Sequence, residues 1–148
     1  MSFLFTETQP EQITGLMPMI SVGLDETYKR WNKQVDWTPR DIYYSIKKGL
    51  AQLNFIYEDK TRIGLVITRY FLAEFEQKKY MHVWLLYLYP EYRRKIWRLL
   101  PELSEFLVKK SKRDGGRYIE MDSPRPGWDR LLYGRHMERN RTVYRKEI

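Results

Sequence analysis

The apolar segment YMHVWLLYLY at residues 80–89 constrains the fold of this chain more than any other part of its sequence. Its apolar residues follow one another without alternation, a pattern typical of a central strand buried on both faces of a sheet. Pro90 lacks a backbone N–H and is expected to end this strand. Because such a strand needs helices on both sides of its sheet, we expect an α/β domain with a mixed sheet.

Two helices are expected before this strand. Thr8 and Glu11 have the spacing of a capping box, which predicts a helix beginning after Thr8. Thr38 and Pro39 form a clearer start signal, because a capping residue is followed by proline at the first helical position. Residues 23–37, between these helices, are expected to form a loop or a broken helix.

The remaining segments complete the expected sheet. Residues 53–57 and 62–75 are rich in β-branched and aromatic residues and are separated by a turn-like polar segment, which predicts a β-hairpin. The other expected elements are a short strand at 3–5, a long helix from about residue 96 to the basic last turn and glycine stop at 109–116, a short strand at 117–121, a helix from 126 to about 137 and a strand at 142–148. We expect one domain over residues 1–148, with a mostly antiparallel sheet of about six strands and about four flanking helices.

The composition excludes several kinds of site. The chain has 148 residues, 43% of them hydrophobic, which is enough for one packed core. It has no cysteine and two histidines, so we expect no disulfide, no thiol nucleophile and no metal site. No apolar run has the length of a membrane span and the first residues lack a signal-peptide pattern, so we expect a soluble cytoplasmic protein without a membrane partner.

The net charge of +8 is unevenly distributed. Residues 91–148 carry 16 Lys and Arg against 9 Asp and Glu, whereas residues 1–90 are nearly neutral. One end or face of the molecule should therefore attract phosphates, an anionic cofactor or an acidic protein surface. Nucleic-acid binding by the basic C-terminal region stays open as an alternative, although the sequence contains no recognition motif.

The stretch LYLYPEYRRKIWRLLPEL at residues 86–103 resembles the GNAT N-acetyltransferase superfamily. In that family a central strand ends in a V-x-P-x-Y-R type sequence and is followed by the pyrophosphate loop (Q/R)xxGx(G/A) and a long helix. Pro90, Tyr92 and Arg93 match the first part of this pattern. The resemblance implies acetyl-CoA as cofactor, bound by Leu88, Tyr89, Arg93, Arg94, Lys95, Ile96, Trp97 and Arg98.

The second part of the pattern is altered in ways that predict weak acetyl-CoA binding. Ile96 and Arg98 occupy the two positions where small residues let the backbone close around the pyrophosphate. Pro101 requires the following helix to start near Arg98 or to kink. Cationic side chains of the segment could bind phosphates in place of the backbone N–H groups; these are Arg93, Arg94, Lys95 and Arg98.

Candidate catalytic residues follow from the same resemblance. The segment SPRPGWDRLLYGRHM at 123–137 is similar to the family's LYxxxGF segment, and Tyr133 falls where the family often has a tyrosine that protonates the departing CoA thiolate. Met137 and Glu138 stand where Gly-Phe is usual. The carboxylates near the expected central strands are Glu74, Glu76, Glu120 and Asp122, of which Glu74 and Asp122 are taken as the general-base candidates. The two histidines have simpler interpretations, His82 as a hydrogen-bonded core residue and His136 as a helix-end residue.

Three functional hypotheses follow. The first is a GNAT-like protein with an eroded pyrophosphate loop that serves as a binding or structural module, similar to small GNAT-like proteins of tailed phages, some of which are virion components. The second is an active acyl-CoA-dependent N-acetyltransferase acting on an amine. The third is a nucleic-acid-binding protein. The expected location is the cytoplasm, or a virion if the chain is of phage origin.

Overall fold

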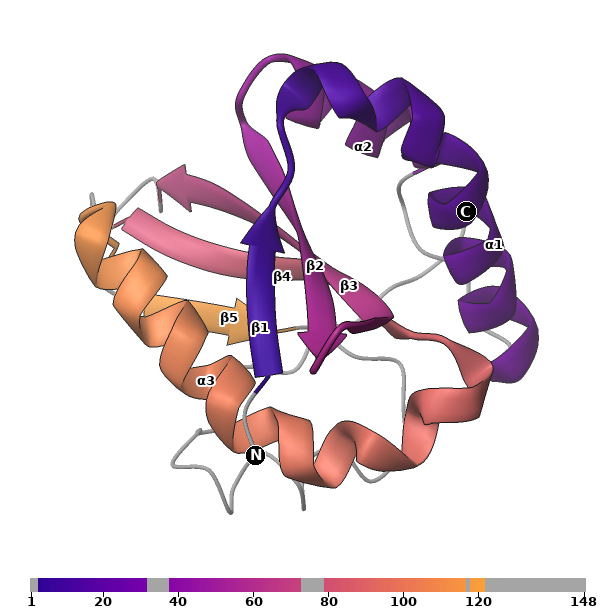
Figure 1. Cartoon of the computed structure of the whole chain (residues 1–148). Helices are drawn as coiled ribbons and strands as arrows, with labels where there is room; N and C mark the ends of the chain where they lie inside the picture. The colour runs from indigo at the N-terminus through magenta and orange to yellow at the C-terminus, as the bar shows by residue number, and fades with distance from the viewer. Residues whose placement is uncertain (1–2, 32–37, 73–78, 117, 122–148) are drawn as a thin grey trace.

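A computed structural model describes residues 3–31, 38–72, 79–116 and 118–121 (Figure 1). The strands of its five-stranded sheet lie in chain order: β1 (Phe3–Glu7), β2 (Ala51–Glu58), β3 (Thr61–Leu72), β4 (Lys79–Leu88) and β5 (Tyr118–Met121). The helices are η1 (Pro10–Gln12), α1 (Ile13–Trp31), α2 (Pro39–Lys47), η2 (Pro90–Lys95) and α3 (Ile96–Arg113), where η denotes a 3-10 helix. The first three strand pairings are antiparallel and β4 pairs with β5 in parallel, which confirms the expected mixed sheet.

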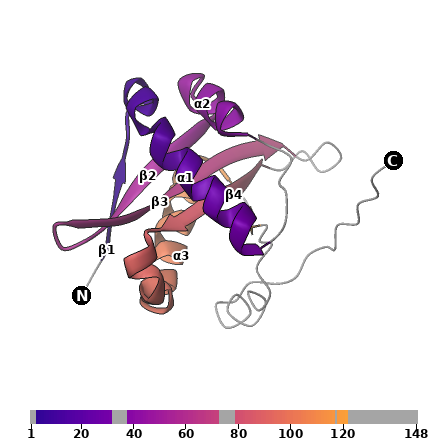
Figure 2. The ribbon, with the colours of Figure 1, turned by 90° about the vertical axis from the view of Figure 1, so that its right-hand side faces the viewer.

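Helices cover both faces of the sheet, so the continuous apolar character of β4 is explained by two cores. On one face, α1 and α2 pack against the strands through Ile13, Ile20, Ile42 and Ile46 (Figure 2). On the other face, α3 packs through Leu99, Leu100, Leu103 and Leu107. Burying each such side chain contributes about 1.5–3 kcal/mol of transfer free energy, which exceeds the weak local preference of any one helix.

A bulge in β4 changes which residues face each core. Ile67 of β3 pairs with Leu85, whereas the next residue, Thr68, pairs with Val83, so Trp84 is an additional residue in β4. Val83 packs on the α3 face, while both Trp84 and Leu85 pack on the α1 face. The bulge therefore reverses the alternation of side chains halfway along the strand.

The first helix begins differently from the prediction. Thr8 does not cap it, because both its backbone N–H and its hydroxyl donate to the carbonyl oxygen of Leu53, the hydroxyl at 2.9 Å. The capping contacts are made instead by Gln9 and Gln12, in the 3-10 helix that precedes Ile13. Thr8, which the sequence pattern assigns to the helix cap, instead extends the pairing of the first strand with β2.

Helix α1 extends to Trp31, so the first part of the segment 23–37, expected to be a loop or a broken helix, continues α1. Gly23 packs directly against the ring of Tyr87, where an added Cβ would lie 3.2 Å from the ring carbons. Pro18 lies inside α1, and this close packing on the sheet stabilises the part of the helix that follows it. Tertiary contact here outweighs the loop-like local sequence.

The second helix and the hairpin confirm their predictions. Thr38 caps α2, and its backbone N–H donates to the carboxylate of Asp41 at 2.7 Å. The strands β2 and β3 are joined by a turn in which Asp59 has a φ of 55°. The fourth helix expected at 126–137 and the strand expected at 142–148 lie outside the described residues.

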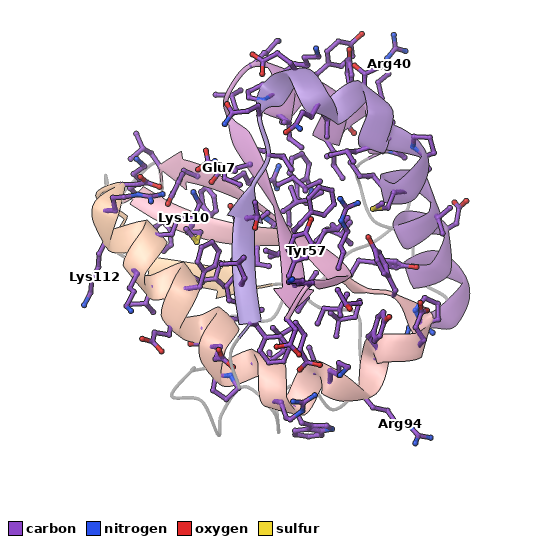
Figure 3. All side chains as sticks on the ribbon, in the orientation of Figure 1. Glu7, Arg40, Tyr57, Arg94, Lys110 and Lys112 are labelled. Atoms are coloured by element: carbon purple, nitrogen blue, oxygen red, sulfur yellow. The ribbon has the colours of Figure 1, made fainter. Side chains whose placement is uncertain are left out.

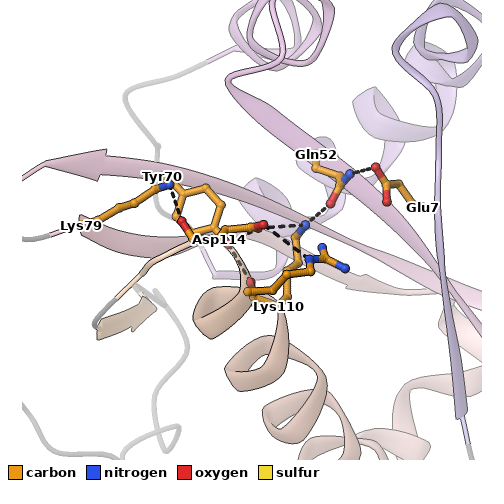
Figure 4. A network of polar contacts seen from close by, with 7 residues as sticks. Glu7, Gln52, Tyr70, Lys79, Lys110 and Asp114 are labelled. Atoms are coloured by element: carbon orange, nitrogen blue, oxygen red, sulfur yellow. Dashed lines mark hydrogen bonds and ion pairs between the residues drawn. The ribbon is translucent and has the colours of Figure 1, made fainter.

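A polar network centred on the buried Lys110 joins the C-terminal end of α3 to the sheet (Figure 4). The ammonium group of Lys110, a residue only 7% exposed, donates to the side-chain oxygen of Gln52 and lies 3.7 Å from the carboxylate of Asp114. Gln52 in turn donates to Glu7 of β1. Tyr70 of β3 donates its hydroxyl proton to Asp114 at 2.7 Å. The network therefore fixes α3 to three strands at the end of the helix farthest from η2.

Candidate functional site

The candidate site lies where β4 passes into η2. Leu88 is buried at the end of β4, and the backbone N–H of Tyr89 donates to the carbonyl of Ile63 in β3 at 2.9 Å. Beside this bond, a Cβ added to Gly64 would lie 2.2 Å from the carbonyl oxygen of Tyr87, so no larger residue fits there without a shift of the backbone. The start of η2 is therefore held tightly against β3.

The parallel pairing of β4 and β5 covers only part of β4. The paired residues run from Tyr80 opposite Tyr118 to Val83 opposite Met121, which is the last described residue of β5. Residues 84–88 extend beyond this pairing toward η2. In sheets with parallel strands, ligands commonly bind outside the carboxyl ends of those strands.

The segment expected to form a pyrophosphate loop is a 3-10 helix that runs directly into α3. The N–H of Tyr92 donates to the carbonyl of Tyr89 at 2.8 Å, and the N–H of Ile96 donates to the carbonyl of Arg93. Pro90 has no N–H to offer. Helix α3 begins at Ile96 with Pro101 inside it, so of the two alternatives that the sequence left open, a helix start near Arg98 is not the one found. The N–H groups of Tyr92 and Ile96 are thus already hydrogen-bonded to carbonyl oxygens and would have to leave them to bind a phosphate.

Two of the four predicted phosphate-binding cations already have an anionic partner. Glu58, at the end of β2, is 9% exposed, and its carboxylate accepts a hydrogen bond from the ammonium group of Lys95. The other carboxylate oxygen forms an ion pair with Arg98, whose nitrogen lies 3.0 Å away. The hydrogen bond from Lys95 lowers the pKa of Glu58, against the opposing effect of burial and with help from the charge of Arg98. These contacts join the start of α3 to the β2–β3 turn.

The other residues of the predicted cofactor site face different ways. Arg94 is exposed and extends away from the body of the molecule (Figure 3). Trp97, one helical turn later, is 59% exposed. Arg93 is half-buried, and Ile96 packs on the α3-side core. Of the four predicted cations, Lys95 and Arg98 meet at Glu58, whereas Arg94 extends away from the molecule.

The predicted catalytic residues are not tested by the described part of the chain. Glu74, Asp122 and Tyr133 lie outside the described residues, as do Glu76 and His136. They stay predictions. Glu120 lies in β5, opposite His82 of β4.

His82 is buried at 8% exposure and is hydrogen-bonded, as expected for a core histidine. Its Nδ1 accepts a hydrogen bond from Nε of Arg69 at 3.1 Å. Because the Nδ1 lone pair is used in this bond, the neutral ring carries its proton on Nε2.

Sequence reasoning missed Glu58 and a second group centred on Arg62. The guanidinium carbon of Arg62 lies 3.8 Å from the ring centre of Phe55, and its Nε donates to the hydroxyl of Tyr57 at 3.4 Å. The hydroxyl of Tyr89 donates to the sulfur of Met19 at 3.3 Å. The hairpin register could have shown the contact between Arg62 and Tyr57, because it places these two residues directly opposite each other. The Glu58 pairs depend on how α3 packs and have no local signal.

Two further observations limit the kinds of site. Within the described ranges, no group of three or more His, Asp or Glu side chains is placed to hold a metal ion. None of the helices that the structure describes is both long enough and apolar enough to cross a membrane.

No protein-family model and no curated protein matches the sequence. Solved structures do match. A ribosomal-protein-alanine N-acetyltransferase from Brucella melitensis biovar Abortus 2308 is 16% identical, with 99% of each chain covered and a TM-score of 0.66. An aminoglycoside acetyltransferase from an uncultured soil metagenomic sample is 11% identical, with a TM-score of 0.68 over 100% of this chain and 99% of its own.

A predicted acetyltransferase from Clostridium acetobutylicum, solved with acetyl-CoA, is also similar to this chain. It is 10% identical, with a TM-score of 0.68 over 99% of this chain and 96% of its own. These likenesses extend over the full length of the chains compared, and the fold is that of the GNAT acetyltransferases. At such low identity the likeness concerns the fold alone.

Proposed function

We propose that this GNAT-fold protein is a binding module with weak or no acetyl transfer, which docks an acidic protein surface against the exposed start of α3. One observation carries the proposal. The segment Pro90–Lys95 forms a 3-10 helix, in which the N–H of Tyr92 donates to the carbonyl of Tyr89, just before the helix, and the N–H of Ile96, just after it, donates to the carbonyl of Arg93. A pyrophosphate would have to break these bonds to gain backbone donors, so acetyl-CoA fits this site poorly.

The side chains of the segment do not replace the lost backbone donors. Lys95 and Arg98 are paired with Glu58, and a phosphate would have to compete with that carboxylate for both of them. The side chain of Arg94 is exposed and extends outward from the molecule (Figure 3). A single flexible arginine gives much less affinity for a polyphosphate than a set of converging donors.

The exposed residues around the start of α3, Arg94 near the end of η2 and Trp97 in the first turn of α3, suit a protein partner. Arg94 and Trp97 are three positions apart and so lie on neighbouring parts of the surface. Tryptophan and arginine are the residue types enriched among energetically important interface residues. The net charge of +8, with its excess after residue 90, would steer an acidic partner toward the molecule.

A place in a phage virion belongs to the same proposal. It rests on the resemblance in size and in loop erosion to small GNAT-like proteins of tailed phages, and it would make the acidic partner another virion protein. Cytoplasmic location is the other possibility within the proposal.

An active acyl-CoA-dependent N-acetyltransferase is the second candidate, and one observation favours it. Residues 84–88 of β4 extend past the described pairing with β5, which leaves the carboxyl end of a parallel pair at the place where ligands commonly bind. A structural neighbour of this fold was solved with acetyl-CoA. Under this candidate Tyr133, Glu74 and Asp122 are the residues to substitute first.

Titration with acetyl-CoA separates the two candidates. A ligand that binds only the folded state at a hundredfold excess over its Kd stabilises a protein by about 2.7 kcal/mol, a readily measured rise in melting temperature. We expect no such rise at micromolar acetyl-CoA. The Clostridium acetobutylicum acetyltransferase, solved with this ligand, serves as the positive control. A large rise for the present chain would contradict the proposal and favour the enzyme.

A further inference from the structure

We propose that Arg62, Tyr57 and Tyr89 form an oxyanion-binding site on the α1 face of the sheet, beside the end of β4. This site is separate from the exposed start of α3 and does not rest on the proposed function. Its three residues come from β3, β2 and the residue after β4. Tyr57 and Tyr89 both pack at the edge of the α1-side core, and Figure 3 shows Tyr57 on the side of the strands that faces α1.

The guanidinium group of Arg62 is held in place before any ligand arrives. It lies over the ring of Phe55, with 3.8 Å between the guanidinium carbon and the ring centre, and over Tyr57 at 5.9 Å. Its Nε donates to the hydroxyl of Tyr57. Stacking and hydrogen bonding restrict a side chain that is otherwise costly to order, so a ligand would lose less conformational entropy on binding here.

No carboxylate neutralises Arg62 among the residues that the structure describes. Other cations have such partners: Lys95 and Arg98 pair with Glu58, and Lys110 pairs with Asp114. The polar partners of Arg62 are phenol hydroxyls alone. Burial lowers the pKa of Arg62, but its bonds to Tyr57 and Tyr89 outweigh that effect and raise it, so the group stays charged.

The two phenols add donors that have no strong acceptor. The hydroxyl of Tyr57 accepts from Arg62, and its own proton has no acceptor within the described ranges. The hydroxyl of Tyr89 donates to the thioether of Met19, which is a weak acceptor. A charged oxygen would be a better acceptor for both protons than either present arrangement.

These donors specify the ligand by its chemistry. Arg62 is a half-buried cation with two neighbouring hydroxyl donors and, in the described part of the chain, no carboxylate bonded to it; the nearest acidic influence is the charge of Glu91 acting on Tyr89. Such a group suits a phosphate or a carboxylate, and arginine binds both through paired N–H groups. A cationic or uncharged ligand would leave the charge of Arg62 without compensation. The shared feature is therefore an oxyanion, and the experiment must distinguish its two sources.

The test titrates the whole chain with sodium phosphate and, separately, with sodium acetate, at constant ionic strength set with chloride. The readouts are the melting temperature and the NMR resonance of the Arg62 Nε–H group. We expect a saturable change with at least one of the two anions. Arg62→Gln should weaken that binding by about 10-fold or more, and Tyr57→Phe by about 2- to 10-fold, in line with the loss of a charged and a neutral hydrogen bond.

Arg40→Gln is the matched control, because Arg40 contacts the ring and hydroxyl of Tyr44 on the surface of α2. It should bind the anion as the wild type does. Arg94→Gln tests whether the start of α3 is responsible instead. No saturable change with either anion, or a loss in Arg94→Gln but not in Arg62→Gln, overturns the proposal. If Arg62→Gln does not fold, unchanged binding in Tyr57→Phe overturns it as well.

Discussion

Glu58 links the β2–β3 turn to the start of α3. Because this link needs an ionised carboxylate, the stability that it contributes depends on pH. Its folded-state pKa is lowered, chiefly by the hydrogen bond from Lys95. A carboxyl group whose pKa is lower in the folded than in the unfolded state stabilises the protein above its unfolded pKa, about 4.3 for glutamate. That contribution is lost as the pH falls through the folded-state value.

Glu58→Gln should therefore reduce stability at pH 7, and its difference from the wild type should shrink as the pH is lowered from 7 through the folded-state pKa of Glu58. The measurement is the urea midpoint of both proteins across this range of pH. Glu105→Gln is the control, because Glu105 forms an exposed pair with Lys109 that contributes little. Equal midpoints of wild type and Glu58→Gln at pH 7 would show that the pairs with Lys95 and Arg98 do not stabilise the fold.

At the scale of elements, α3 contains a proline at an interior position, where proline destabilises a helix. Pro101 lies inside the helix, is exposed, and cannot donate to the carbonyl four residues earlier. Pro101→Ala should restore that hydrogen bond and raise the free energy of unfolding by about 1–3 kcal/mol. Chemical denaturation measures the change. Pro39→Ala provides the contrast, because Pro39 is at the first position of α2, where no N–H is needed and no gain is expected.

The elements also show how far the sequence alone could lead. The hairpin, the buried central strand and α2 were predictable because each carries its own local signal, such as the cap at Thr38. The start and length of α1 were not, because Thr8 bonds to β2 and Gly23 packs on Tyr87, contacts between residues far apart in sequence. In the candidate site, too, some features were predictable from the sequence and others were not. The replacement of glycine by Ile96 and Arg98 was visible in sequence, whereas the partner of Arg98, Glu58, depends on tertiary packing.

At the scale of the whole molecule, charge should control how fast a partner arrives. Arg94→Ala combined with Trp97→Ala should slow association with immobilised poly-glutamate, a model acidic polypeptide, by several-fold, because both a steering charge and an exposed aromatic contact are lost. Surface plasmon resonance at two salt concentrations measures this effect. Lys109→Ala, an exposed cation farther along α3, is the control. Stronger binding to double-stranded DNA than to poly-glutamate would favour the nucleic-acid hypothesis instead.

The order of the strands has a consequence for synthesis on the ribosome. β2, β3 and β4 are neighbours both in the chain and in the sheet, so they can pair as soon as each is made. β1 is made first, yet its only described partner, β2, follows α1 and α2. The first strand, with Phe3 and Phe5 in it, must therefore stay unpaired while the next fifty or so residues are translated, a delay of several seconds at ordinary elongation rates.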